Sequence, residues 1–245
     1  KSLYKLSNEL SISKENLIAV DILNKSELYS ALTHAKSEYD GDIACLIIAT
    51  SAVPKLHYLS LIKMLILKCF GYKSSLQFGY KLNQMPREVD FISQKDQIEC
   101  AIQNGCKHVI LLGTMGISQG PSSFLNSMGN GKIVMWKRKA EQFLVNESGV
   151  DHYTVIHCGG LQDIPGGKRQ LIVDVDDKIM ENDMKSRTIS RDDVADVCVK
   201  AVQFPELFKG RAFDLASKPM DDGPPTQDIA ELMNNMKQNC SYDTE

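Results

Sequence analysis

A hydroxyl group and a lysine occupy positions where they could act on a small molecule. Thr114 directly follows an apolar run at 107–113, and Lys137 opens a later segment with helical spacing. A continuous apolar run bounded by turn residues is typical of a strand buried on both faces. Ligands of open α/β sheets bind outside the carboxyl ends of the strands. We therefore expect Thr114 to lie at a ligand site, with the helix that carries Lys137 following it.

These residues also have purely structural interpretations. Thr114 could satisfy local backbone groups, and Lys137 and Lys139 could belong to a solvated helix face. His157 falls in a predicted strand, where a histidine is more often a hydrogen-bonded core residue than a base. Cys158 could be a small packing residue or a redox-sensitive thiol at a strand end.

Composition excludes several classes of function. The chain has 245 residues, a net charge of −3 and a pI of about 6.0, which gives no electrostatic reason to expect nucleic acid as a partner. The seven cysteines are scattered, with no C-x-x-C pair and no Cys/His cluster of zinc spacing. We therefore expect no metal site and a reducing compartment.

The longest apolar segment, 56–70, contains Lys63 and Lys68 and is too short to span a bilayer. Its helical spacing predicts a packed or interface helix. No secretory signal opens the sequence, so we expect a cytoplasmic protein, monomeric or homodimeric. An organellar location stays open because the sequence does not include an N-terminal targeting region.

Apolar runs and turn residues divide the chain into alternating elements. Interior strands are predicted at 17–20, 43–49, 107–113 and 153–157. A possible edge strand at 171–175 and a last short strand at 212–216 follow. Helices are predicted at 26–32, 87–104, 190–202 and 226–239. Alternation of this kind predicts parallel strands, right-handed crossovers and helices on both faces. The expected fold is α/β, a doubly wound parallel, Rossmann-like sheet in a three-layer α/β/α domain covering 1–245.

Five short motifs occur in the order seen in one known family. They are Asp21 after a strand, Thr50-Ser-Ala-Val-Pro54, Gly113-Thr-Met-Gly116, Lys137-x-x-Ala-Glu141 and Cys158-Gly-Gly-Leu161. A later stretch, Arg191-Asp-Asp-Val-Ala195, fits the same pattern. Together they resemble the atypical short-chain dehydrogenase/reductases, most closely the NmrA-like, NAD(P)-binding members of plants and bacteria. The resemblance covers roughly residues 15–235.

The resemblance implies NADP or NAD as cofactor and assigns roles by position. Thr114 stands where the family usually has a catalytic serine, and Lys137 matches the lysine that binds the nicotinamide ribose. Adenine and its ribose would contact Asp21, Ile22, Thr50, Ser51, Ala52 and Val53. The nicotinamide ring would be bordered by Cys158, Gly159, Gly160 and Leu161. We expect all of these residues to converge on one crevice.

The first departure from the family pattern concerns the phosphate cradle. A Rossmann site holds pyrophosphate in a glycine-rich turn between its first strand and first helix. No such turn precedes residue 15, so we expect upstream residues to supply it and this chain alone to bind dinucleotide weakly. Gly113-x-x-Gly116-x-x-x-Gly120 is not a substitute, because Pro121 and a polar loop follow it instead of a helix.

The second departure concerns the proton donor. Ile133 stands four residues before Lys137, where the family has a catalytic tyrosine. An aliphatic side chain cannot take part in a tyrosine–lysine proton relay. A proton would have to come from Thr114 through water, from Tyr153, from a histidine or from solvent.

Three functions therefore stay open. The chain could be an NAD(P)H-dependent oxidoreductase acting on a small carbonyl or quinone-like substrate. It could be a dinucleotide-binding sensor or scaffold without turnover, which the missing tyrosine favours. It could also be a shortened chain with weak cofactor binding or none. Segments 161–188 and 220–245 are expected on the substrate side.

Overall fold

The protein is an α/β structure built on one seven-stranded sheet. The computed structural model describes residues 11–38, 41–72, 77–116, 126, 132–182 and 187–242. The strand order is β1-β4-β5-β9-β8-β6, with β7 also paired to β9. The parallel part consists of β1 (Leu46–Ile48), β4 (His108–Thr114), β5 (His152–Cys158) and β9 (Arg211–Ser217). The Rossmann-like prediction is confirmed in its main layer.

The far edge of the sheet is mixed. There lie β6 (Gly160–Gln162), β7 (Leu171–Asp174) and β8 (Thr188–Ser190). Both β7 and β8 run antiparallel to β9, while β6 is parallel to β8. The expectation of a wholly parallel sheet is therefore wrong at this edge. Strand β9 is also longer than the short strand predicted at 212–216, since all seven of its residues pair with neighbours.

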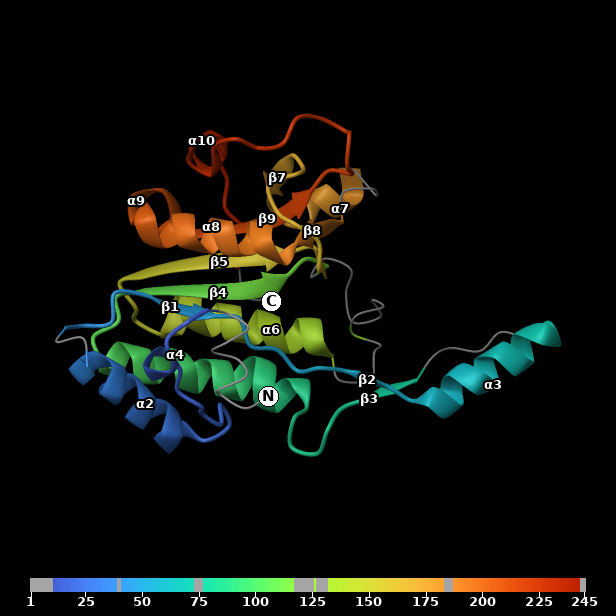
Figure 1. Cartoon of the computed structure of the whole chain (residues 1–245), viewed down its shortest axis with the longest axis horizontal. Helices are drawn as coiled ribbons and strands as arrows, with labels where there is room; N and C mark the ends of the chain where they lie inside the picture. The colour runs from blue at the N-terminus through green and yellow to red at the C-terminus, as the bar shows by residue number, and fades with distance from the viewer. Residues whose placement is uncertain are drawn as a thin grey trace.

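Helices cover both faces of the sheet, as Figure 1 shows. One face carries α2 (Lys25–Glu38), α4 (Ser93–Gln103) and α6 (Ile133–Gln142), and the π-helical turns η2 (Arg87–Ile92) and η4 (Phe143–Glu147) extend the last two. The other face carries α8 (Arg191–Gln203), α9 (Pro205–Phe208) and α10 (Ile229–Asn235). The described helices also include the short segments η1 (Lys14–Asn16) and α7 (Lys178–Asn182), and α3 (Tyr58–Cys69), which lies apart from the sheet. The predicted three-layer architecture is confirmed.

Strands β4 and β5 are buried on both sides, which explains their continuous apolar sequence. Val109 and Leu111 face the core under α4 and α6, whereas Ile110 belongs to the core under α8. The register pairs Thr114 with Cys158, so both strands end at the same level. The strand predictions at 107–113 and 153–157 are confirmed.

The strand predicted at 17–20 is wrong. These residues have no regular secondary structure, and Ile18 is 47% exposed. A strand needs a neighbour for its backbone hydrogen bonds, and none lies beside 17–20 in the part of the chain that the structure describes. The prediction at 43–49 reduces to β1, which pairs on one side with β4.

The helix predicted at 226–239 is also too long. It begins at the Asp228 cap, whose Oδ1 accepts a hydrogen bond from Ala230 N at 2.8 Å, and it ends at Asn235. The chain then bonds to β9 instead. Asn239 Oδ1 accepts from Ala212 N at 2.8 Å, and Cys240 N donates to Ala212 O at 2.9 Å. Helix α8 does begin as predicted, with Ser190 Oγ accepting from Asp193 N at 2.9 Å.

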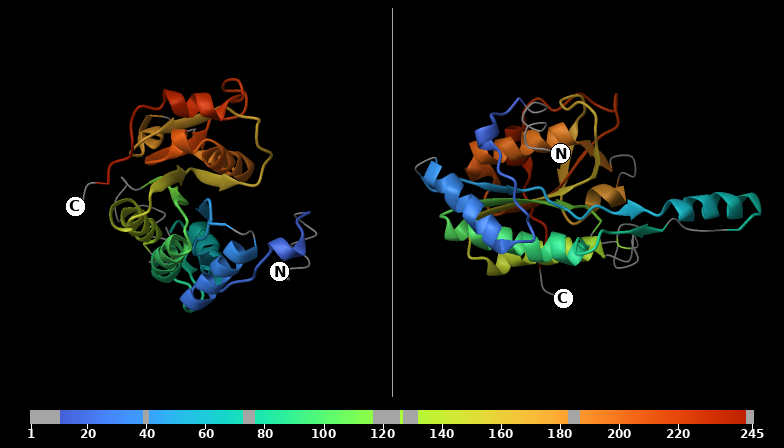
Figure 2. Two further views of the ribbon diagram at one scale, coloured as in Figure 1. Left: turned by 90° about the vertical axis from the view of Figure 1, so that its left-hand side faces the viewer. Right: turned by 60° about the horizontal axis from the view of Figure 1, so that its bottom comes forward.

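Helix α3 (Tyr58–Cys69) projects away from the body of the molecule (Figures 1 and 2). The pair β2 (Lys55–Leu56) and β3 (Phe78–Gly79) joins it to the body. Leu59 is 81% exposed and Ile62 54%. The expectation that this segment packs into the core is wrong, and its role as an interface helix stays a prediction. No helix in the described residues has the length and apolar character needed to cross a membrane.

Candidate functional site

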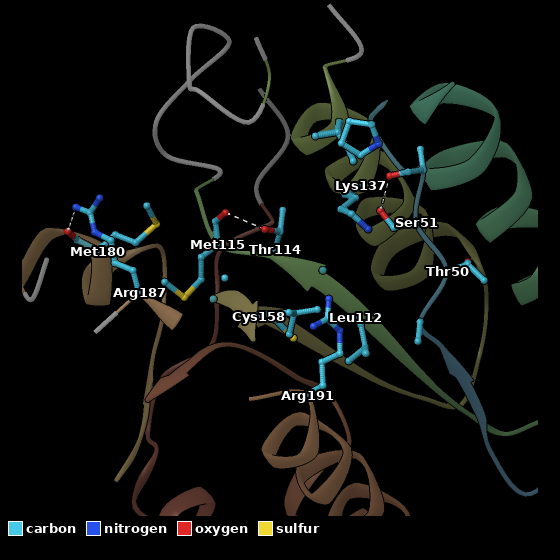
Figure 3. Close-up of a pocket in the computed structure, with 18 residues that line it drawn as sticks. Thr50, Ser51, Leu112, Thr114, Met115, Lys137, Cys158, Met180, Arg187 and Arg191 are labelled. Atoms are coloured by element: carbon cyan, nitrogen blue, oxygen red, sulfur yellow. Dashed lines mark hydrogen bonds between the residues drawn. The ribbon is translucent and has the colours of Figure 1, made fainter. Parts of the chain in front are cut away.

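A pocket of about 730 Å³ opens at the carboxyl ends of β1, β4 and β5 (Figure 3). Its size falls within the range typical of small-molecule sites. Its walls come from the segment after β1, the end of β4, helix α6, the turn after β5, and Met180, Arg187 and Arg191. The candidate residues that line it are Thr50, Ser51, Ala52, Thr114, Lys137, Cys158, Gly159, Gly160 and Leu161.

Lys137 is held by a carboxylate that sequence reasoning did not identify. Its Nζ lies 2.9 Å from Asp90 Oδ1, and the two side chains are only 10% and 0% exposed. Asp90 Oδ2 also accepts a hydrogen bond from Ala52 N at 3.0 Å. One buried carboxylate therefore joins η2, α6 and the loop after β1. A buried ion pair is stable only when its remaining atoms are also hydrogen-bonded, and the Ala52 N–H meets that need.

Helix α4 holds the backbone of the loop after β1. Gln94 Nε2 donates to Thr50 O at 2.9 Å, and Gln97 Nε2 donates to Thr50 Oγ1 at 3.3 Å. Both glutamines are almost fully buried. The segment that contains Thr50, Ser51 and Ala52 is thus fixed in place beside Lys137.

The ends of β4 and β5 present Thr114 and Cys158 side by side. Thr114 Oγ1 donates to Met115 O at 3.2 Å, which matches the local backbone interpretation. Cys158 is 4% exposed, and burial raises the pKa of its thiol to about 12. A thiol in that state is neither a nucleophile nor readily oxidised, so Cys158 acts as a packing residue in the pocket floor.

The turn after β5 requires glycine at position 159. A Cβ atom there would lie 2.8 Å from Arg187 O. Gly160 N donates to that same carbonyl at 2.7 Å, which starts the pairing of β6 with β8. This close backbone approach brings Arg187 and, one turn later, Arg191 to the pocket wall.

The single crevice expected from the sequence is divided. Asp21, Ile22 and Val53 line a separate pocket of about 180 Å³, which adjoins the larger one through Ser51 and Ala52. Asp21 Oδ1 accepts from Leu23 N at 3.0 Å, so this carboxylate stabilises the turn that leads into α2. Asp21, Ile22 and Val53 thus line the adjoining pocket and not the larger one, and their convergence with Thr114 and Lys137 on one ligand stays a prediction.

A buried polar cluster lies beneath the pocket, on the α6 side of the sheet. His157 Nδ1 lies 3.0 Å from Asp214 Oδ1, and His157 Nε2 lies 3.1 Å from Glu141 Oε2. Tyr242 and Cys240 approach the same ring at 3.2 and 3.5 Å. Burial opposes protonation of His157, but Glu141, Tyr242 and Asp214 outweigh it and raise the pKa of His157 well above 6.5.

His157 is therefore a hydrogen-bonded core residue between two carboxylates, and the structural interpretation of this residue is confirmed. Nδ1 of His157, Oδ of Asp214 and Sγ of Cys240 lie within 4.8 Å of one another. These groups already serve one another as hydrogen-bond partners. The expectation of no metal site stays a prediction.

Gly113 is required by this cluster. A Cβ atom at Gly113 would lie 2.3 Å from Glu141 Oε1 and 2.8 Å from His157 Cδ2. The glycine that ends the apolar run of β4 thus gives room for the buried ion pair. The Gly116 N–H donates to Asp177 Oδ1 at 2.6 Å, so it is not available to a phosphate. Gly120 of the rejected glycine motif lies outside the described residues.

Ile133, at the position of the missing tyrosine, does line the pocket. Tyr153 lies near the opposite end of β5 and contributes to the core under α6. Neither it nor a histidine is among the described pocket residues. Of the proposed proton sources, Thr114 with water, and bulk solvent, remain.

The segments expected on the substrate side differ in position. Segment 161–188 contributes Leu161, Met180 and Arg187 to the pocket. Its Gly166–Gly167 loop is instead bonded to α8, with Gly167 N donating to Asp193 Oδ1 at 2.6 Å. Among the described residues after 220, α10 packs against α8 and α9, and Cys240 and Tyr242 join the His157 cluster.

Sequence reasoning did not identify Asp90, Gln94 or Arg187 as site residues. It also did not place Arg191 at the pocket wall. Asp90 and Gln94 fall inside a predicted helix and carry no local signal for a partner far along the chain. Arg191 was visible, because it follows a cap serine and stands at the start of a helix after a strand.

Comparisons with known proteins agree with this geometry. A family model described as NAD(P)H-binding matches residues 73–205, more than half of the chain. An uncharacterized chloroplastic protein of Arabidopsis thaliana is 43% identical over 194 residues, which cover 78% of this chain and 54% of that protein. Sanguinarine reductase of Eschscholzia californica is 47% identical over 156 residues, 64% of this chain and 55% of the relative. The chain thus spans about half the length of these curated relatives.

Solved structures with low sequence identity share the fold. A short-chain dehydrogenase/reductase of Veillonella parvula in complex with NADP has a TM-score of 0.51 at 11% identity, covering 85% of this chain and 75% of that one. An anaerobillin reductase of Escherichia coli O157:H7 has a TM-score of 0.50 at 19% identity, covering 84% and 75%.

Proposed function

Since the chain belongs to the NAD(P)H-binding family, we propose that it is part of an NAD(P)H-dependent oxidoreductase of the atypical short-chain type. The substrate is a small carbonyl or quinone-like compound. The resemblance drawn from its motifs is confirmed by the family match. The proposal is supported by two reductases among the similar proteins and by a pocket at the strand ends.

The observation that carries the proposal is the buried Lys137–Asp90 pair at the pocket wall. A buried cation that is fixed by a carboxylate can donate hydrogen bonds to a ligand without moving. Lys137 would bind the nicotinamide ribose, and Thr50 to Ala52 would contact the adenosine side. Cys158, Gly159 and Leu161 would border the ring and exclude water from it.

The bound nicotinamide would supply a hydride. With Ile133 in place of a phenol, no fixed acid among the described residues stands ready to protonate a product oxygen at the position where the family has one. This favours acceptors whose reduced form is stable before it is protonated, such as quinones. Thr114 through water, or solvent, would deliver the proton afterwards.

The pocket residues fit the nicotinamide and its ribose. Lys137 supplies a cation, Gly159 and Gly160 leave space, and Leu112 and Met115 are apolar. Either NADP or NAD is the cofactor. The Asp21 pocket, which adjoins the larger one, would take the adenine end. The described residues hold no glycine-rich turn that leads from a strand into a helix, so the phosphate contacts are not assigned to any of them.

Titration tests cofactor binding, and single-turnover kinetics tests reduction. NADPH and NADH are titrated separately by calorimetry, and oxidation of the bound cofactor is then followed with menadione, an aldehyde and sanguinarine. We expect Lys137→Met to weaken dinucleotide binding about tenfold or more, since a charged hydrogen bond is lost.

Lys139→Met is the matched control, because Lys139 is exposed on the same helix and contacts the Trp136 ring at 5.0 Å. Equal affinities for the two variants would remove Lys137 from the cofactor site. Because this chain alone is expected to bind weakly, the titration extends to high cofactor concentration, and a wild-type chain that binds neither dinucleotide there would refute the proposed function.

A dinucleotide-binding sensor without turnover is the second candidate, favoured by Ile133 at the position of the catalytic tyrosine. Tight cofactor binding without oxidation by any acceptor would support it. The chloroplastic relative favours an organellar location over a cytoplasmic one for this protein.

A further inference from the structure

Helix α3 presents an apolar stripe to solvent along its whole length. Residues three and four positions apart share one side of a helix. The side chains of the stripe, each between 53% and 81% exposed, are Tyr58, Leu59, Ile62, Leu65, Ile66 and Phe70, the last at the helix cap. A contiguous exposed apolar surface of this kind is typical of a site that contacts a protein or a membrane.

The opposite side of α3 is held by the chain that returns from it. Ser60, which is buried, donates through Oγ to His57 O at 2.7 Å and accepts from Gln77 N at 2.9 Å. His57 N also donates to Gln77 O at 2.9 Å. Met64 and Leu67 continue the Ser60 side along the helix and are half-buried. These contacts fix the rotation of α3 about its axis, and the apolar stripe therefore faces outward.

The charges around the stripe are all positive. Lys63 and Lys68 are exposed and border the stripe on its two sides, since successive residues of an α-helix are about 100° apart. Five lysines, one arginine and no Asp or Glu occur in the sequence from 43 to 87. The whole chain nevertheless has a net charge of −3. The apolar stripe thus belongs to a cationic segment of an acidic protein.

This charge favours a lipid surface over a second copy of the same helix. Two α3 helices packed along their stripes would bring four lysines to one seam, and neither helix offers a carboxylate to pair with them. Anionic headgroups attract such lysines, while the acyl boundary beneath them accepts apolar side chains.

The size of α3 determines how it could lie on a bilayer. It has 12 residues, which at 1.5 Å per residue give a length of about 18 Å, too short to cross the hydrocarbon core. Tyr58 stands at its start and Phe70 and Tyr72 follow its end. Aromatic side chains are favoured at the boundary between headgroups and acyl chains, which suits a helix that lies in the plane of the surface.

We propose that α3 is a membrane-surface helix that docks the protein on bilayers rich in anionic lipids. The apolar stripe enters the boundary between headgroups and acyl chains, and Lys63 and Lys68 contact the acidic headgroups. The β2–β3 pair holds α3 away from the sheet and its covering helices, so the helix reaches the surface without moving the body (Figures 1 and 2). This docking does not depend on cofactor binding or turnover.

Co-sedimentation with lipid vesicles tests the proposal on the whole chain. One set of vesicles is phosphatidylcholine alone, and the other contains about 30% phosphatidylserine. We expect the chain to bind the anionic vesicles at least about tenfold more tightly than the neutral ones at low salt. Binding should weaken strongly at about 0.5 M salt, where the headgroup charges are screened.

Two double variants separate the contributions of the stripe and of the charges. Ile62→Glu with Ile66→Glu should abolish binding, because it places carboxylates in the apolar stripe. Lys63→Gln with Lys68→Gln should weaken binding to anionic vesicles about tenfold or more and remove most of the preference over neutral ones.

Val199→Glu with Val202→Glu is the matched control. These side chains are 49% and 42% exposed on α8, and their replacement changes the net charge by the same amount as the isoleucine variant. The control should bind anionic vesicles as the wild type does. Circular dichroism of each variant shows whether the fold is intact.

Three results would overturn the proposal: a wild type that does not bind anionic vesicles, equal binding to both kinds of vesicle, or equal losses in the α3 and α8 variants. Light scattering addresses the alternative occupant. A wild-type dimer that the isoleucine variant dissolves, without vesicle binding by either, would assign the stripe to a second copy of this chain.

Discussion

At the scale of single residues, the candidate site depends on charges that are buried in pairs. Lys137 forms an ion pair with Asp90, and His157 lies between the carboxylates of Glu141 and Asp214. Removing one member of such a pair leaves an uncompensated charge in the interior, which costs more than the pair itself contributes. Lys137 and Glu141 lie one helical turn apart on α6, so the same helix presents one charge to the pocket and one to the core.

Asp90→Asn should destabilise the fold strongly, because it leaves the Lys137 ammonium without its counter-ion. We expect a loss of about 3 kcal/mol in the free energy of unfolding, measured by urea denaturation. Asp96→Asn is the control, since Asp96 pairs at 2.9 Å with Lys25, whose side chain is 47% exposed. That control should lose no more than about 1 kcal/mol. Similar losses in the two variants would contradict the importance assigned to burial.

At the scale of elements, α3 differs from every helix that covers the sheet. Its apolar residues face solvent, and Ser60 is its only buried residue. A helix with this many apolar residues normally packs its apolar side against a neighbour. Helix α3 is attached to the body only through the β2–β3 pair among the described residues. His57 packs closely over Gly79 of this pair, since a Cβ atom on Gly79 would lie 2.6 Å from His57 Nε2. The stability of the body should therefore be nearly independent of this helix.

The double substitution of Ile62 and Ile66 by Glu tests that independence. Because both side chains are more than half exposed, we expect the free energy of unfolding to change by less than about 0.5 kcal/mol for each substitution. Ile98→Ala in α4, at a fully buried position, should cost about 2 to 5 kcal/mol. The free energies of unfolding of the two variants are measured by circular dichroism during thermal and urea unfolding. A large loss in the α3 variant would show that the helix packs on the body.

At the scale of the whole molecule, the His157 cluster joins parts that are distant in the sequence. Helix α6 supplies Glu141 and Arg138, strands β5 and β9 supply His157 and Asp214, and the C-terminal segment supplies Cys240 and Tyr242. Arg138 also lies 3.9 Å from the Tyr242 ring centre and donates to Ser241 O.

This cluster should make stability depend on pH. Folding raises the pKa of His157 well above 6.5, mainly through Glu141 once the opposing cost of burial is overcome. The stabilisation is therefore full below pH 6.5 and is lost as the pH rises through the raised pKa. Urea denaturation between about pH 6 and about pH 10 measures it. His157→Gln should reduce stability at the acidic end and flatten the pH dependence, and an unchanged slope would refute the assignment.

The sequence by itself determined the parallel core and most of the pocket. Runs at 107–113 and 153–157 are apolar because those strands are buried on both faces, and a strand that ends there must place Thr114 and Cys158 at the ligand edge. The Ser190 cap was equally readable, since a cap depends on residues three positions apart.

Only the tertiary structure decided the rest, because those features depend on partners far along the chain. Residues 17–20 have the composition of a strand, but no described strand pairs with them. Asp90 forms an ion pair with Lys137, which lies 47 positions later in the sequence. The segment after Asn235 leaves the helical conformation because it forms hydrogen bonds with β9. Arg187 also lines the pocket through a distant partner, since its carbonyl accepts a hydrogen bond from Gly160 N in the turn after β5.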